Sequence, residues 1–349
     1  MGRGICGASF AVKTTTVICI CVVALLIVTV LAAVLGSVDI PPGRVIRVAL
    51  SGLGLADGAL VPESERLILI EVRFPRVVLI ALVGGALAIC GATLQATFQN
   101  GLADPTILGV SGGGALGAVL AIHAGLAERV FMSLPACAFA GALLSGLLVY
   151  LIAHLGGKPS TSSLLLTGVA IGTLTGAGVS LVLVWSEEYR LRELLFWLVG
   201  GAEGRTWEHV ALAAPPIILG GIGLFAMHRH IDALMLGEEH ALSVGLPVAS
   251  SRVILLALCA LVSGAAVSVS GSIAFVGLIV PHAVRLLVGP RAKALLPASF
   301  FGGAAFLVLC DLLARLASRR SEVHLGILTA FLGVPYFLYL LSRSKRTAV

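Results

Sequence analysis

Long windows without a charged side chain alternate with short polar stretches along most of the chain. A charged side chain at the centre of a bilayer costs about 2.5–3.5 kcal/mol on insertion scales, so charge-free windows predict membrane-spanning helices. A spanning helix needs about 20 apolar residues, and the pattern therefore predicts an all-α, polytopic membrane protein. The windows are Thr14–Val38, Val77–Ala103, Pro105–Ala127, Val130–Gly157, Pro159–Ser186, His209–His228, Val253–Val284, Ala294–Cys310 and Val323–Ser342.

One window, Val253–Val284, holds 32 residues and is too long for a single upright helix. It contains Ser270-Gly271-Ser272 and then Pro281, and both are typical points at which a helix breaks. Splitting this window raises the nine windows to ten predicted spans. An even number of spans places both termini on the same side of the membrane.

The first window follows Arg3 and Lys13, as the apolar core of a secretory signal does. Its 25 residues exceed the roughly 7–15 residues of a signal's apolar region, so we interpret it as a retained first helix. No linker or low-complexity segment interrupts the series of windows. The whole chain, residues 1–349, is therefore expected to form one transmembrane domain.

The composition agrees with this pattern, because 58% of the residues are hydrophobic, only 11% are charged and the mean hydropathy is +1.09. A soluble domain carries about 25% charged residues, so a water-soluble protein is excluded. The net charge of +6 suits anionic lipid and acidic protein partners rather than nucleic acid. The 7 cysteines include no CxxC pair and predict neither a disulfide framework nor a zinc site.

The chain lacks the motifs of an energy-converting or hydrolytic site. No GxxxxGK[ST] or HExxH occurs, so neither ATP binding by a P-loop nor zinc-dependent hydrolysis is expected, and the chain is not predicted to be an enzyme. Asp311 and Glu322 could suggest a proton relay, but both lie at window edges near Arg315. Local ion pairs or helix caps are the preferred interpretation.

Four groups of residues form a pattern more specific than hydrophobicity. The first is Arg73-x-Pro75-Arg76, Gly91 with Gln95, Asn100-x-Leu102-Ala103-Asp104-Pro105 and Leu108-Gly109-Val110-Ser111. The second is Leu236-Gly237-Glu238-Glu239-x-Ala241 with Leu242-x-Val244-Gly245. The third runs from Ser268-Val269-Ser270-Gly271 to Pro281-His282 and Arg285. The last is Asp311-x-x-Ala314-Arg315 with Glu322, Gly326-Ile327-x-Thr329-Ala330, Gly333 and Pro335.

In this order, from about residue 73 to about residue 340, the pattern resembles the FecCD family of ABC importer permeases, which serve vitamin B12, ferric siderophores and haem. The resemblance implies the type II ABC importer permease fold in a bacterial inner (plasma) membrane, and a homodimer with the cargo pathway at its two-fold interface. It also implies two separate ATP-binding subunits and a periplasmic substrate-binding protein as partners. ATP and Mg would then be bound by the partner ATPase, and no cofactor is expected on this chain.

The resemblance also implies that Arg73, Arg76 and Arg315 dock the binding protein on the external side. A charge at the rim of an interface steers encounter and fixes register. Arginines that snorkel to lipid headgroups are the alternative. The 23 Lys and Arg residues divide almost evenly between the two predicted sides, so the positive-inside rule gives no orientation and leaves the external arginines unexplained. The unexplained external arginines favour the interpretation that they dock the binding protein.

The segment of about residues 229–250 matches the cytoplasmic coupling region of the family, which contacts the ATPase. The residues that carry this match are Leu236, Gly237, Glu238, Glu239, Ala241, Leu242 and Gly245. An amphipathic helix lying on lipid is the alternative, but such helices usually carry a basic polar face. The adjacent glutamates therefore favour contact with a protein.

Two further sets of residues are candidates for the cargo pathway. Thr161, Ser162 and Ser163 match the region that narrows the cytoplasmic end of the pathway in the family, although Ser and Thr are also ordinary helix caps. His324 lies in Val323-His324-Leu325, where the family usually has Pro-Val or a similar pair. This departure makes His324 a candidate contact with the cargo, as a haem ligand.

The cargo expected from this reading is an iron complex, haem or a ferric siderophore, so that iron and haem transport are the predicted processes. Vitamin B12 is the alternative within the family. A proton-coupled secondary carrier is the rival from another class, and it would transport without an ATPase. A purely structural membrane scaffold would transport nothing.

Overall fold

The structure is a computed structural model that describes residues 14–36, 38–52, 54–55, 60–155, 161–317 and 323–346. Within these ranges all regular structure is helical. Seven helical runs are long and apolar enough to cross a membrane: α1 (Thr14–Val34), the run Glu63–Thr97 that ends in α4 (Phe74–Thr97), α7 (Ser133–His154), α8 (Thr161–Trp185), α10 (Trp207–Ala226), α13 (Val248–Ser270) and α15 (Ala292–Ala317).

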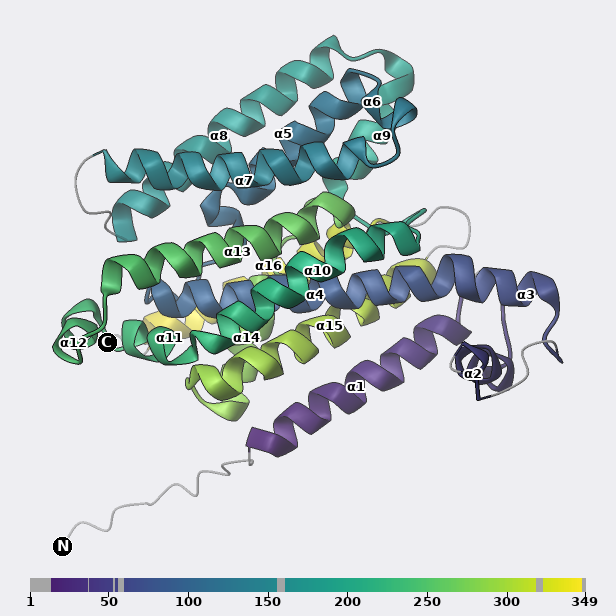
Figure 1. Ribbon diagram of the computed structural model, residues 1–349, viewed down its shortest axis with the longest axis horizontal. Helices are drawn as coiled ribbons and strands as arrows, with labels where there is room; N and C mark the ends of the chain where they lie inside the picture. The colour runs from purple at the N-terminus through teal and green to yellow at the C-terminus, as the bar shows by residue number, and fades with distance from the viewer. Residues whose placement is uncertain are drawn as a thin grey trace, which may run out of the picture.

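Three further apolar helices occupy the remaining predicted windows, and the apolar part of the last of them is Leu325–Leu338. They are α5 (Val110–His123), α14 (Val276–Val288) and α16 (Leu325–Arg346). Each of the ten predicted spans therefore corresponds to a helix, and the all-α polytopic fold is confirmed. The helix α1 begins, and α16 ends, at the same end of the bundle, as the even number of spans requires (Figure 1).

Short helices distinguish the two ends of the bundle (Figure 1). One end, here called the α9 end, carries α2 (Pro42–Ser51), α3 (Glu63–Leu67), the π-helical turn η2 (Ile68–Arg73), α6 (Leu126–Arg129) and α9 (Glu188–Val199). The opposite end, the α12 end, carries α11 (His228–Met235) and α12 (Glu238–Ser243). The 3₁₀ turn η3 (Pro105–Leu108) precedes α5.

The helix α4 lies at the centre of the bundle, and all of its residues from Val83 to Thr97 are buried. It approaches α14 so closely at Gly91 that a methyl group there would overlap the backbone of Gly277. Small residues permit this kind of contact between helices in a membrane, where packing rather than the hydrophobic effect drives association.

The long window of residues 253–284 divides where the sequence predicts a break. The helix α13 ends at Ser270, Gly271 has a φ of +69°, and α14 starts only after Phe275. The second predicted break is wrong, because Pro281 lies inside α14. A proline leaves the carbonyl four residues earlier without its helical donor, and here the side-chain amide of Gln95 donates to that Gly277 oxygen at 3.1 Å. Gln95 of α4 thereby allows α14 to continue.

Candidate functional site

A charged cluster occupies the α9 end, where Asp311 of α15 lies between two arginines. Its Oδ1 accepts hydrogen bonds from Nε and Nη2 of Arg76 at 3.1 and 2.9 Å. Its Oδ2 lies 3.1 Å from Nε of Arg315, one helical turn further along α15. Asp311 is 1% exposed, so each of its oxygens is balanced by a different guanidinium group inside the protein.

Glu203 and His324 extend this cluster from the loop before α10 and the start of α16. One carboxylate oxygen of Glu203 lies 3.7 Å from Nη2 of Arg76 and 3.6 Å from Nδ1 of His324. The imidazole ring of His324 also contacts Phe196, with 4.5 Å between the ring centroids. We call Arg76, Glu203, Asp311, Arg315 and His324 the charge cluster.

Arg205, next to this cluster in the same loop, contacts His209, with 3.2 Å between Nη1 and Nε2. Burial lowers the pKa of Arg205, and the nearby Glu203 acts in the opposite direction. A guanidinium group has so high an unperturbed pKa that it stays charged at neutral pH. The loop therefore brings one more permanent cation beside the charge cluster.

Two of the three predicted docking arginines cap the end of α1. Arg73 donates to the carbonyls of Ala33 at 2.6 Å and Val34 at 2.9 Å, and it also bonds the Val38 carbonyl. Arg315 donates to the carbonyls of Ala32 and Leu35 at 3.1 and 3.3 Å. The last carbonyls of a helix have no donor within the helix and carry its negative partial charge, so cations are favourable there.

The three arginines thus come together at one end, as predicted, but their charged groups point into the protein. Arg73 is 5% and Arg76 is 9% exposed. The capping role was not foreseen, since no local signal links residue 73 or 315 to the end of the first helix. Nothing in this geometry tests the docking role, which stays a prediction. For Asp311, the expected local ion pair is present with Arg315, whereas the pair with Arg76 joins distant parts of the chain. Glu322 lies outside the described residues.

The predicted coupling region forms two short helices, α11 and α12, at the opposite end. Gly237 connects them with a φ of +115°, and Gly245 follows α12 with a φ of +79°. Ala241 is buried, whereas Leu236 is 64% and Leu242 is 56% exposed. Glu238, Glu239, His240 and Val244 are also exposed. Apolar and acidic groups therefore share one uncovered surface.

Three polar contacts hold this region to the spans. Gln99, just after α4, donates to the carbonyl of Leu234 at 2.9 Å. Asp232 accepts a hydrogen bond at 2.6 Å from the backbone amide of Ala292, at the start of α15. Glu238 pairs with Arg252 of α13 at 3.2 Å. A force applied to α11 and α12 would reach α4, α13 and α15 through these contacts.

The predicted gate residues lie at the start of α8, at the same end as α12 (Figure 1). Ser162 is exposed and Ser163 is half-buried, and the side chain of Thr161 is outside the described part of the structure. Their role as a gate is not tested by this geometry. Among the described residues, no group of three His, Cys, Asp or Glu side chains could hold a metal ion.

Comparison with known proteins agrees with this arrangement. A model of the FecCD transport family matches residues 24–343. The cobalamin import system permease protein BtuC of Halobacterium salinarum is 47% identical over 281 residues, which cover 80% of this chain and 75% of the relative. The vitamin B12 import system permease protein BtuC of Escherichia coli O9:H4 is 38% identical over 289 residues, covering 82% and 86%. A solved structure of a metal-chelate type ABC transporter in an inward-facing conformation superposes with a TM-score of 0.81 at 29% identity, covering 94% of this chain and 99% of the other.

Proposed function

Because the chain belongs to the FecCD transport family, we propose that it is the permease subunit of an ABC importer for cobalamin, vitamin B12. The observation that carries this cargo is the 47% identity to a cobalamin permease over 80% of the chain, together with 38% identity to a vitamin B12 permease. These names favour the cargo that the sequence analysis ranked as the alternative, and they give no support to haem or a ferric siderophore. Family membership itself makes the chain an ABC importer permease embedded in the membrane.

The proposed partners follow from the two ends of the bundle. An ATP-binding subunit would dock at the α12 end, where Leu236 and Leu242 are exposed beside Glu238 and Glu239. Such a mixture of apolar anchors and charges is typical of protein interfaces. This assignment makes the α12 end cytoplasmic. Two copies of this chain, two ATPase subunits and one periplasmic binding protein complete the proposed complex.

The binding protein would dock at the α9 end. Arg73, Arg76 and Arg315 are proposed to act there through the positive field of their guanidinium groups, since so little of their surface is exposed. A buried guanidinium group that is paired with a carboxylate produces a weaker positive field outside the protein than an unpaired one does. Docking by these residues would therefore depend on the same contacts that cap α1 and bind Asp311.

Transport would proceed by rigid-body alternation of the spans, which needs a cavity and two docking surfaces but no catalytic side chain. ATP binding and hydrolysis in the partner would move α11 and α12. The contacts of Gln99, Asp232 and Glu238 would pass this movement to α4, α15 and α13. Ser162, Ser163 and Thr161 are the proposed gate, and His324 is the proposed contact with the metal chelate.

The experiment that tests this function is uptake into proteoliposomes that contain this chain and its ATPase. Cobalamin, haem and a ferric siderophore would each be offered with a matching binding protein. We expect ATP-dependent uptake of cobalamin alone, and none when the ATPase is omitted. Uptake of an iron complex instead would overturn the cargo. Uptake that persists without the ATPase and stops when the proton gradient is dissipated would establish a secondary carrier.

A further inference from the structure

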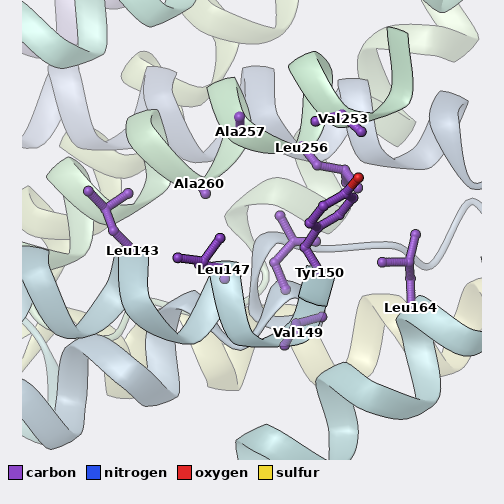
Figure 2. Close-up of a pocket in the computed structure, with 11 residues that line it drawn as sticks. Leu143, Leu147, Val149, Tyr150, Leu164, Val253, Leu256, Ala257 and Ala260 are labelled. Carbon is purple, nitrogen blue, oxygen red and sulfur yellow. The ribbon is translucent and has the colours of Figure 1, made fainter. Parts of the chain in front are cut away.

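An apolar cavity of about 290 Å³ lies between α7, α8 and α13. Figure 2 shows Leu143 and Leu147 of α7 pointing toward α13, which carries Ala257 and Ala260 on the opposite wall. The volume is close to the lower end of the range of about 300–1,000 Å³ found for small-molecule pockets. Except for the hydroxyl of Tyr150, the side chains that line it are hydrocarbon. Among these lining side chains, a polar cargo would find only the Tyr150 hydroxyl as a hydrogen-bond partner.

The cavity has a charged mouth at the α12 end. A smaller adjoining cavity shares four of its lining residues, namely Tyr150, Leu164, Val253 and Leu256. It adds His154, Arg252 and Glu238. Tyr150 stands at the junction, with its ring 4.8 Å from that of His154, measured between centroids. The apolar cavity therefore opens toward Arg252 and His154, at the end of the bundle where α7 ends and α13 begins.

We propose that this cavity binds one anionic phospholipid, with an acyl chain between α7 and α13 and its phosphate at Arg252 and His154. The chemistry of the two parts requires an amphipathic ligand with a long hydrocarbon portion and an anionic head. In a membrane-spanning chain, the surrounding leaflet supplies such a ligand at this depth. Basic residues near the membrane surface attract anionic headgroups by about 1 kcal/mol each, which corresponds to about five-fold in binding.

The site is connected to α12 through Glu238. The carboxylate of Glu238 lies 3.2 Å from Nη2 of Arg252, so a phosphate at the mouth competes with it for the same guanidinium group. Glu239 and His240 are the other ionisable groups on α12, and both are exposed. Bound lipid would therefore loosen one of the contacts between α12 and α13. If α12 is the coupling helix, as the proposed function holds, the lipid would tune coupling to the ATPase.

Native mass spectrometry of the purified full-length chain tests the lipid site directly. Delipidated protein would be titrated with phosphatidylglycerol or with phosphatidylethanolamine of the same acyl chains. We expect one phosphatidylglycerol to be retained, with about five-fold preference over the zwitterionic lipid. Ala257→Phe and, independently, Leu147→Trp narrow the cavity from exposed positions and should abolish this retention. Ala211→Phe, at an exposed position on α10, is the matched control and should retain the lipid.

Substitutions at the mouth of the cavity test the contact with the headgroup separately from the contact with the acyl chain. Arg252→Gln should remove the preference for the anionic lipid, and Arg252→Lys should keep it. Glu238→Gln should strengthen phosphatidylglycerol binding, because it removes the competing carboxylate. A purely structural ion pair predicts no change for Glu238→Gln. Equal retention of both lipids, or retention unaffected by both cavity-filling variants, would overturn the proposal. These readouts need no transport, so their failure leaves the cobalamin assignment untouched.

Discussion

At the α9 end Asp311 is buried between Arg76 and Arg315, whereas at the α12 end Leu236 and Leu242 are exposed to the surroundings. Both regions were predicted from the sequence to be docking surfaces. The charge cluster neutralises itself, because the two carboxylates of Asp311 and Glu203 lie against the two guanidinium groups of Arg76 and Arg315. The coupling region leaves its apolar groups uncovered.

The difference shows that an arginine predicted to dock a partner can also stabilise the fold of its own chain. Arg73 and Arg315 donate to the last carbonyls of α1, and Arg190 of α9 donates to the carbonyls of Ile122 and His123 at the end of α5. Helices that end at this side of the membrane present negative partial charge there. Arginine caps therefore account for part of the positive charge that the sequence analysis predicts to be external and that the positive-inside rule leaves unexplained.

The largest effect should come from Asp311→Asn. Removing one partner of a buried ion pair typically costs about 3–5 kcal/mol, because the remaining charges stay buried without compensation. We expect a strongly lowered melting temperature and poor recovery of the purified protein. Glu71→Gln, at an exposed position in η2, is the control and should melt like the native protein. Equal melting of both variants would show that the cluster does not stabilise the fold.

Arg73→Gln should have the next largest effect, by removing the charged cap of α1. Hydrogen bonds to charged groups contribute about 1.5–3 kcal/mol, so the free energy of unfolding should fall by that amount. Thermal unfolding in detergent measures it. A surface that serves only for docking predicts unchanged stability and lost uptake. Arg66→Gln, exposed on α3 at the same end, should change neither quantity by much.

Leu242→Glu tests the α12 end, where a substitution should weaken assembly with the ATPase and leave the stability of the permease unchanged. A central apolar contact of an interface contributes about 2 kcal/mol, which corresponds to roughly thirty-fold weaker assembly with the ATPase. The stability of the permease should change by no more than about 0.5 kcal/mol, as for other exposed sites. Copurification with a tagged ATPase measures assembly. Leu55→Glu, at an exposed position near α2, is the control. Normal assembly of Leu242→Glu would contradict the coupling role.

Arg44→Gln should have the smallest effect on stability. It compares an exposed ion pair at the α9 end with the buried pairs of Asp311 at the same end. Arg44 of α2 pairs with Glu65 of α3 at 2.5 Å, but its side chain is 44% exposed. Exposed ion pairs contribute about 0.2–1 kcal/mol, and less in high salt. The melting temperature of the variant should lie slightly below that of the native protein in low salt, and this difference should disappear in high salt, where the native pair is screened. A loss as large as that of Asp311→Asn would mean that exposure does not distinguish the two pairs.

The sequence by itself determined the number of spans and the break at Ser270-Gly271-Ser272. These features are local: each depends on the hydrophobicity of about 20 consecutive residues or on the backbone freedom of a glycine. The family match also followed from motifs in chain order. The cargo did not follow from the sequence motifs, because no residue pattern in the spans encodes an iron complex or a corrinoid.

Only the tertiary structure decided which side chains meet. Pro281 continues α14 because Gln95, 182 positions before Gly277, supplies the missing donor. Arg73 and Arg315 cap a helix that ends 39 residues or more before either of them in the chain. The cavity needs α7, α8 and α13 to pack side by side. The physical reason is the same in each case. A buried polar group needs a hydrogen-bond partner, and a cavity needs side chains to line it. Both come from residues that the fold brings together from distant parts of the chain.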